Sequence, residues 1–154
     1  MKLYVGITDN KWFNLLRASQ PLDEVNFWQP SGNKIFKTLS PGELFLFKLH
    51  SPLNYIVGGG LFAHSSILPI SLAWEAFGRS NGAESFNEMR ANVARFRNNG
   101  DDRNVDFNIG CILIEQPFFL PEDKWIPVPY DWKPGIQQGK SYDLSVEPGH
   151  SLWE

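Results

Sequence analysis

The sequence predicts an α+β fold, in which helices are inserted between the strands of a small, curved, mixed or antiparallel β-barrel. Within residues 44–50, Phe45, Phe47 and Leu49 recur at every second position, as in a strand, and residues 55–64 return from a short hairpin loop as a second strand. Three consecutive glycines, Gly58 to Gly60, lie within the second strand, where glycine marks a bulge, a bend or a close approach by another backbone. Helical periodicity elsewhere in the chain favours α+β over an all-β fold.

The first elements are a strand, a short helix and a second strand. Residues 2–7 alternate, and Asp9 follows them as a good N-cap for a helix whose apolar positions run from Trp12 to Leu16. Residues 23–28 then form a short strand that enters a loop marked by proline and glycine. This loop therefore begins directly after two aromatic residues.

Two helices are predicted after the hairpin. Ser71 lies at the start of the first, and Gly78 is its expected stop. Ser85 and Glu88 fit a capping box for the second, whose apolar face extends to Phe96. Phe96 is therefore expected in the core.

The C-terminal third is predicted to complete the barrel. Residues 107–114 form a buried strand, residues 117–134 a surface segment rich in proline and aromatic residues, and residues 139–144 a last short strand. We expect one recognition domain over residues 1–144, with residues 145–154 as a linker.

Composition indicates a soluble globular protein. The 154 residues are 42% hydrophobic and 20% charged, with no apolar run long enough to cross a membrane. The N-terminus lacks the features of a secretion signal, so the cytoplasm is the expected compartment. Cys111, the single cysteine, lies in an apolar run and is expected to be buried and unreactive.

The charge of the chain argues against a general polyanion binder. The net charge is −3, whereas such binders are normally basic. Lys34, Lys37 and Lys48 nevertheless outnumber Glu43 within residues 31–64. Any contact with nucleic acid should therefore use one local face and a specific pocket.

No catalytic or cofactor motif is present. The histidines, His50, His64 and His150, do not have the spacing of a zinc site, and no phosphate-binding glycine loop or nucleophile elbow occurs. We therefore expect no metal, no cofactor and no enzymatic activity from this chain alone.

Aromatic residues in unusual positions suggest a pocket for a planar base. Trp28 precedes a polar turn, Tyr55 begins a strand, and Trp74 lies off the apolar face of its helix. Such rings can stack on a base while polar side chains read its edge. The candidate edge readers are Asn26, Gln29 and Ser31. Core packing is the alternative for each of the three aromatic residues.

Four basic residues are candidates for contacts with a phosphate backbone, because they fall on the loop, strand and helix end around this predicted pocket. They are Lys34, Lys37, Lys48 and Arg79. Ordinary solvated surface positions are the alternative.

Several segments together resemble the N-terminal region of a set of bacterial HNH endonucleases. They are residues 26–32, 39–52, 56–60, 71–78, 109–111, 125–129 and 139–144. In that family the HNH nuclease domain follows at the C-terminus. The resemblance implies a double-stranded DNA partner and a missing C-terminal HNH domain.

The strand-turn-strand core with its preceding tryptophan also resembles the PUA superfamily, which includes EVE, ASCH and YTH domains. EVE-type domains read modified cytosine in DNA, and YTH domains read methylated adenine in RNA. By this resemblance Trp28 forms the first wall of a base cage and residues 29–31 form its rim. Tyr55 or Trp74 would supply the second wall.

The predicted function is recognition of a flipped, modified base in DNA for an HNH restriction endonuclease, with 5-methyl- or 5-hydroxymethylcytosine as the expected base. An RNA-binding module of the ASCH or YTH kind and a pocket for a small molecule or nucleotide are the alternatives. N6-methyladenine and a phosphorothioate backbone are the other candidate targets.

Overall fold

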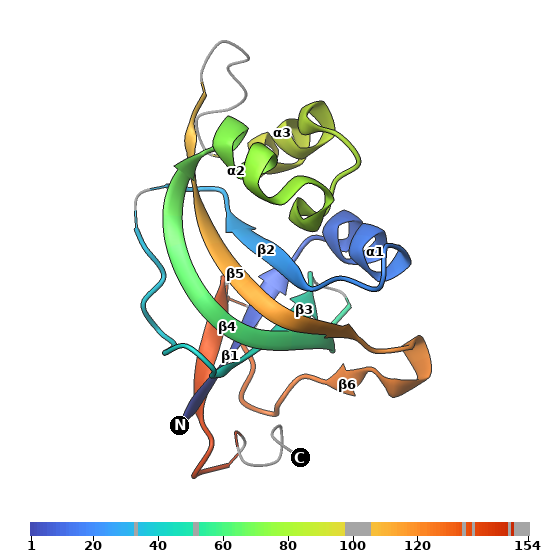
Figure 1. Cartoon of the computed structure of the whole chain (residues 1–154). Coiled ribbons are helices and arrows are strands. Elements are labelled where there is room, and N and C mark those ends of the chain that lie inside the picture. Colours follow the sequence, from blue (N-terminus) through green and yellow to red (C-terminus); the bar gives the residue numbers. More distant parts are fainter. Residues whose placement is uncertain are drawn as a thin grey trace.

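A strongly curved β-sheet carries the helices of the protein. The structure is a computed structural model that describes residues 1–32, 34–50, 53–97, 106–133, 135–136, 138–147 and 149. The strands of the sheet are β1 (Lys2–Thr8), β2 (Glu24–Gln29), β3 (Leu44–Leu49), β4 (Tyr55–Pro69), β5 (Asn108–Phe119), β6 (Ile126–Pro127) and β7 (Gly139–Asp143). Figure 1 shows the long strands β4 and β5 running side by side around the molecule.

The sheet is mixed and open. Its strand order is β2-β5-β4-β3-β1-β7, with β6 paired to the start of β4. The pair β1–β3 is parallel, and the other described pairs are antiparallel. The predicted α+β class with a curved mixed sheet is confirmed. The predicted closure into a barrel is not found, because the order ends at β2 and β7 without a pairing between them among the described residues.

The glycines of β4 lie where neighbouring strands leave no room for a side chain. A Cβ on Gly58 would collide with the carbonyl oxygen of Phe118, and one on Gly59 would lie 2.6 Å from the carbonyl oxygen of Phe45. Register shifts in the β4–β5 ladder follow between Gly59 and Leu61. Close approach of other backbones beside a bulge, among the alternatives that the sequence left open, therefore explains these glycines.

In the described part of the chain, three α-helices lie on one side of the curve: α1 (Asn10–Ala18), α2 (Ile70–Phe77) and α3 (Phe86–Ala94). The short 3-10 turns are η1 (Gly78–Asn81) and η2 (Glu122–Lys124). The predicted stop at Gly78 is confirmed, since this glycine has φ +51°. The predicted cap at Ser85 is also confirmed, because its hydroxyl oxygen accepts a hydrogen bond from the Glu88 backbone N–H at 3.2 Å.

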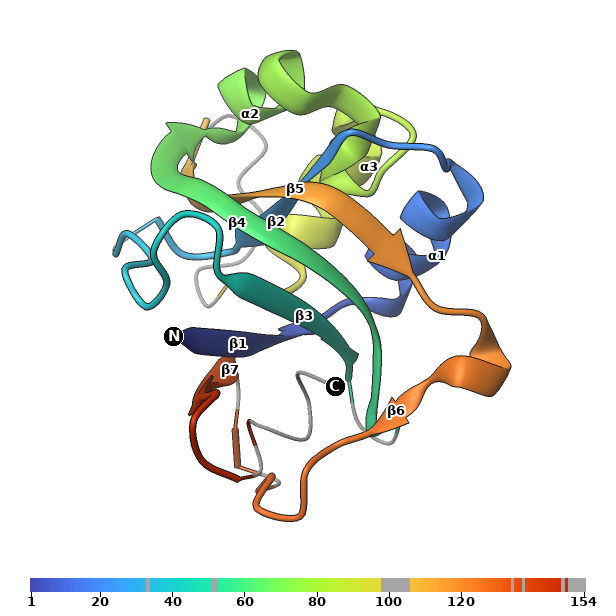
Figure 2. The same cartoon turned by 60° about the horizontal axis from the view of Figure 1, so that its bottom comes forward.

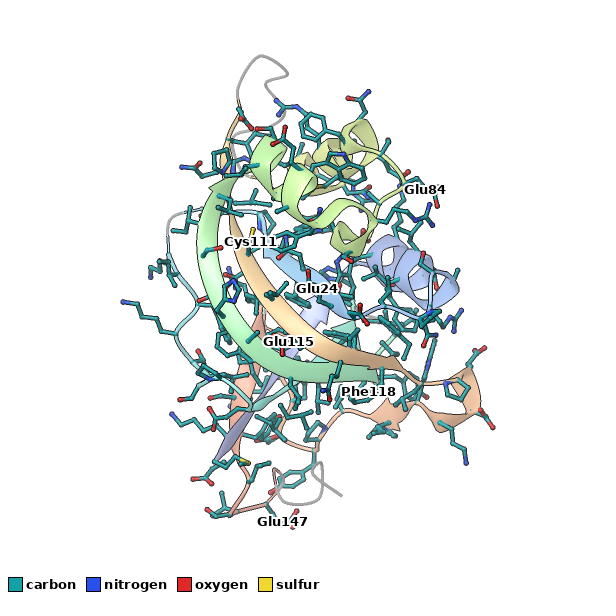
Figure 3. All side chains as sticks on the ribbon, in the orientation of Figure 1. Glu24, Glu84, Cys111, Glu115, Phe118 and Glu147 are labelled. Carbon is teal, nitrogen blue, oxygen red and sulfur yellow. The ribbon has the colours of Figure 1, made fainter. Side chains whose placement is uncertain are left out.

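Among the described residues, the core has three parts. The largest lies inside the curve of the sheet, where Trp12 and Phe13 of α1 meet Phe27, Phe45 and Phe47 of the strands. A second part packs α2 and α3 on β5, and Figure 3 shows Cys111 of β5 beneath these helices. A third lies on β1, β3 and β7, strands that Figure 2 shows side by side.

The long strands exceed their predicted limits. Strand β4 continues to Pro69, five residues beyond the expected end at residue 64, and β5 continues to Phe119 rather than ending at residue 114. Alternation is weak in these extensions, so period-2 patterning could not reveal them. In the tail expected as a linker, residues 148 and 150–154 lie outside the described residues.

Helix α3 ends earlier than its pattern predicted. The helix stops at Ala94, and Phe96 lies just beyond it with 40% of its surface exposed. Phe96 is therefore not a core residue. Among the described residues, no helix is long and apolar enough to span a bilayer.

Candidate functional site

A pocket of about 270 Å³ opens between the N-terminal end of α1, the end of β2 and the segment after α3. Its lining residues come from elements that are far apart in the sequence. They are Ile7, Thr8, Asp9, Trp12, Phe27, Trp28, Gln29, Pro30, His50, Phe96 and Gln138. The volume is slightly below the ~300 Å³ at which pockets for drug-sized ligands begin, so the pocket matches a ligand smaller than these.

Aromatic rings form much of the pocket. Phe27 of β2 and Trp12 of α1 form part of the pocket wall. Their rings meet edge to face, with centroids 5.5 Å apart. The rings of His50 and Phe96 are almost parallel, 4° apart in plane, with their centroids 5.6 Å apart. Phe96 also approaches the Trp28 ring at 6.2 Å. These walls favour a planar, polarisable ligand.

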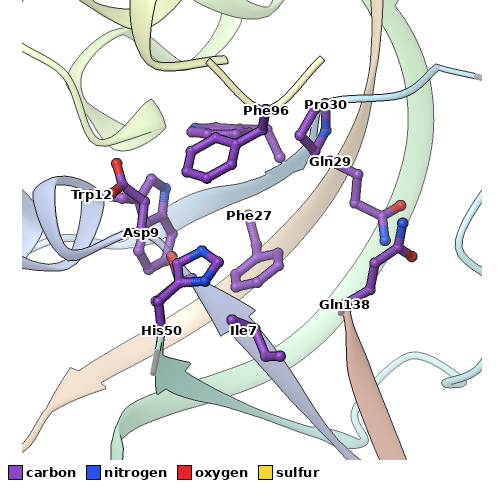
Figure 4. Close-up of a pocket in the computed structure, with 11 residues that line it drawn as sticks. Ile7, Asp9, Trp12, Phe27, Gln29, Pro30, His50, Phe96 and Gln138 are labelled. Atoms are coloured by element: carbon purple, nitrogen blue, oxygen red, sulfur yellow. The ribbon is translucent and has the colours of Figure 1, made fainter. Parts of the chain in front are cut away.

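Polar groups meet the pocket on two sides. Figure 4 shows Asp9 beside Trp12, with Gln29 and Gln138 across the opening from it. Arg95 donates a hydrogen bond to Oδ2 of Asp9 at 3.1 Å. No described residue forms a hydrogen bond with the side-chain amides of Gln29 or Gln138. The pocket therefore combines apolar faces with polar edges that have unused hydrogen-bonding capacity.

Local packing holds the walls in place. The indole N–H of Trp12 donates to the backbone oxygen of Asn26 at 3.1 Å. Gly82 has φ +79° and lies so close to the Trp12 ring that a Cβ there would overlap it. On the other side, a Cβ on Gly110 would lie only 3.1 Å from Oε1 of Gln29. Gly82 and Gly110 thus leave the space that the Trp12 ring and the Gln29 side chain fill beside the pocket.

The surroundings of His50 favour the neutral form of its imidazole. Partial burial lowers the pKa of His50 below its ordinary value, and the charges of Lys48 and Arg95 lower it further, whereas the carboxylate of Asp9 acts in the opposite direction. A neutral imidazole has one donor and one acceptor nitrogen. His50 therefore offers the pocket a ring face and two different polar atoms.

Two of the predicted base-contacting residues lie in the pocket. Trp28 and Gln29 both line it, and Trp28 donates its indole N–H to the backbone oxygen of Asn81 at 3.0 Å. Trp28 also packs against two of the core clusters. Trp28 therefore lines the pocket, as predicted for a wall, and also packs in the core, as the alternative stated.

The other predicted edge readers lie outside the pocket lining. Asn26 is fully buried, and its amide nitrogen donates to Oδ1 of Asn81 at 2.8 Å. The amide of Asn81 in turn donates to the backbone oxygens of Ala73 and Gly78. Asn26 therefore holds β2 to η1. Ser31 lies exposed in the loop beyond the pocket rim.

Tyr55 and Trp74, the candidates for a second wall, are placed elsewhere. Tyr55 begins β4 and packs against Trp125 at 6.0 Å, next to β6. Trp74 packs on the core beneath α2 and α3. Phe96 and His50 line the pocket, and Tyr55 and Trp74 do not.

The predicted backbone contacts divide into exposed and occupied side chains. Lys34 and Lys37 are exposed. Lys48 is not available to a phosphate group as predicted, because it is only 1% exposed and its amine donates to the Leu49 backbone oxygen at 2.8 Å. A register shift between Phe47 and Lys48 accompanies this inward placement, which alternation did not indicate. Arg79 forms an ion pair with Glu84 at 2.9 Å.

Sequence patterns did not reveal Asp9, His50, Phe96 and Gln138 as members of one site. The local patterns assign Asp9 to a helix cap and Phe96 to the core. Their juxtaposition depends on contacts such as that between Arg95 and Asp9, which lie 86 positions apart. The local signals were only the N-cap position of Asp9 and the apolar position of Phe96 at the end of a predicted helix.

Reactive groups are few in the described part of the chain. Cys111 is buried as predicted, and burial raises the pKa of its thiol to about 11. His64 is exposed on β4, and His150 lies outside the described residues. Within the described ranges, no group of three or more His, Cys, Asp or Glu residues could hold a metal ion.

Comparison with known proteins gives a likeness of fold. No family model matches the chain, and no curated protein matches its sequence. The ASCH protein of Zymomonas mobilis superposes with a TM-score of 0.56 at 10% identity, covering 93% of this chain and 89% of that one. A Tyr-to-Phe mutant of that protein gives a TM-score of 0.58 at 10% identity, with coverage of 99% and 96%. A Ser-to-Ala mutant gives 0.56 at 8% identity, with coverage of 98% and 92%.

The likeness covers almost the full length of both proteins. The chain therefore has the fold of an ASCH domain, which is of the PUA-like type. This agrees with the PUA-like architecture that the sequence resemblance implied.

Proposed function

We propose that this protein is a nucleic-acid recognition module that takes one unstacked base into the pocket beside Trp28 and Gln29. The pocket itself carries the proposal: aromatic faces for stacking lie around polar edges for hydrogen bonding, at the size of one ring system. Proteins that read or modify a base inside a duplex flip it into pockets with these properties. The PUA-like fold is consistent with this role.

The partner that we propose is double-stranded DNA carrying 5-methyl- or 5-hydroxymethylcytosine. The resemblance of residues 26–32 and 39–52 to the N-terminal region of HNH endonucleases supports this choice. In that setting the chain binds the modified site, and an HNH domain beyond it cuts the DNA. Binding without cleavage is the expected behaviour of this chain alone.

Binding to a panel of matched duplexes tests the proposal. The panel carries no modification, 5-methylcytosine, 5-hydroxymethylcytosine, N6-methyladenine or phosphorothioate, at one fixed salt concentration. We expect one cytosine-modified duplex to bind at least about tenfold more tightly than its unmodified counterpart, because pocket contacts are worth about 1–3 kcal/mol. Fluorescence anisotropy gives the dissociation constants.

Two additional samples distinguish the alternatives. Single-stranded RNA with the same modified base would bind more tightly than the duplex if the module acts on RNA. Free modified nucleoside would bind as well as DNA if the pocket serves a small molecule. Equal, weak binding of all duplexes would contradict recognition of a modified base.

A further inference from the structure

Asp9 occupies the N-cap position of α1 without using its side chain as a cap. The helix begins at Asn10, and the Asp9 backbone oxygen accepts the first helical hydrogen bond from Phe13 N–H at 3.1 Å. Its carboxylate accepts no hydrogen bond from the backbone N–H groups of the first turn. An aspartate at this position ordinarily accepts such a bond, so the Asp9 carboxylate lacks its usual backbone partners.

Asp9 lines the pocket instead. Its side chain is 12% exposed, and Oδ2 is held by Arg95 at 3.1 Å. No described residue donates a hydrogen bond to Oδ1. An ion pair thus holds one carboxylate oxygen of a residue that lines an aromatic pocket, while the other oxygen has no hydrogen-bond donor among the described residues.

A carboxylate at this edge discriminates between classes of base. It accepts hydrogen bonds and cannot donate them, so it pairs with the exocyclic amino group of cytosine or adenine. The oxo group at the same ring position of thymine, uracil or hypoxanthine is also an acceptor, and two acceptors repel. The amides of Gln29 and Gln138 can donate or accept, so they do not impose this choice.

We infer that Asp9 is the specificity-determining residue of the pocket and selects bases that bear an exocyclic amino group over their oxo counterparts. The inference rests on the proposed function, and it adds the chemical class of the base and the residue that recognises it. Arg95 acts as a positioning residue by holding Oδ2.

Two isosteric pairs of bases test the inference with the full chain. Each duplex carries one central base opposite an abasic site, so that every base is unpaired to the same degree. The first pair is 5-methylcytosine and thymine, which share the 5-methyl group, and the second is adenine and hypoxanthine. Dissociation constants are measured for the wild type, for Asp9→Asn and for Asp131→Asn.

Asp131→Asn is the matched control. Like Asp9, Asp131 is an aspartate in an ion pair, here with Lys140 at 2.6 Å, and it does not line the pocket. Urea denaturation of both variants shows whether each retains the folded state. For the wild type, the ratio of the two dissociation constants within each pair of bases tests the selection without any substitution.

The wild type is expected to prefer the amino member of each pair by about tenfold or more, the discrimination that one well-placed pair of hydrogen bonds provides. Asp9→Asn is expected to bring both ratios close to one, since an asparagine amide can also donate to an oxo group. Asp131→Asn is expected to keep the wild-type ratios.

The failure of the inference differs from the failure of the proposed function. Wild-type ratios near one, or an equal loss of affinity for all four bases in Asp9→Asn, would overturn the inference while binding of modified DNA persists. Absence of binding to every duplex would overturn both.

Discussion

At the residue scale, the pocket contains aromatic side chains of two kinds. Trp12 and Phe27 are buried in the main core, and Trp28 bridges two core clusters while its indole N–H is bonded to η1. Phe96 is 40% exposed and lies beyond the end of α3. Phe96 is therefore the ring whose removal reports on binding rather than on folding.

Phe96→Ala is expected to weaken binding of the preferred duplex about tenfold, because base–aromatic stacking contributes about 1–3 kcal/mol per base. The midpoint of urea unfolding should change little, since the ring is partly solvated already. Binding is measured by anisotropy and unfolding by circular dichroism.

Leu72→Ala is the matched control for this substitution. Leu72 is 45% exposed on α2 and does not line the pocket. It should leave affinity unchanged. Full affinity in Phe96→Ala would show that this ring is not a wall of the base site.

The residue scale also shows which parts of the site were open to sequence reasoning. Trp28 and Gln29 are identifiable because they end a strand directly before a loop marked by proline and glycine. Asp9 and Phe96 have plausible local roles as a cap and a core residue. Only tertiary packing, which brings Arg95 to Asp9, reveals that both face one pocket.

At the scale of elements, the bend of β4 determines where the sheet can curve. The sequence predicted a bend from three adjacent glycines, and the structure confirms that Phe118 and Phe45 backbones approach Gly58 and Gly59. The sequence could not show whether the barrel closes, because closure requires pairing between β2 and β7 at the two ends of the strand order. Local alternation does not encode such distant pairing.

Gly58→Ala is expected to destabilise the fold by about 1–3 kcal/mol, the usual effect of adding volume to a tightly packed interior. The added methyl group would collide with the Phe118 carbonyl oxygen, so the β4–β5 ladder must shift. Urea unfolding measures the change.

Gly135→Ala is the control for an added methyl group. Apart from its chain neighbours, no atom of a described residue lies within 4 Å of the position that a Cβ on Gly135 would take, and the φ of this glycine lies outside the left-handed range. The effect on stability should lie within about 0.5 kcal/mol, as for ordinary surface substitutions. Equal stability of the two variants would show that the bend tolerates a side chain.

At the scale of the whole molecule, charge limits how this protein holds a polyanion. The chain has a net charge of −3. Lys48 is buried, Arg79 is paired with Glu84, and Arg95 is paired with Asp9. Of the four cations predicted to contact phosphate groups, only Lys34 and Lys37 are both exposed and outside a described ion pair. Affinity should therefore come chiefly from the base pocket.

This balance predicts a shallow dependence of affinity on salt. With about three phosphate contacts or fewer, binding of the preferred duplex should fall less than about a hundredfold between about 50 and 200 mM salt, whereas proteins with about 6–10 contacts lose about 10³–10⁵. A titration of anisotropy at several salt concentrations gives the slope. Unmodified DNA should show the same slope at lower affinity, because a modified base adds pocket contacts without adding phosphate contacts. A fall of about 10³ or more would mean that a larger basic surface than Lys34 and Lys37 engages the backbone.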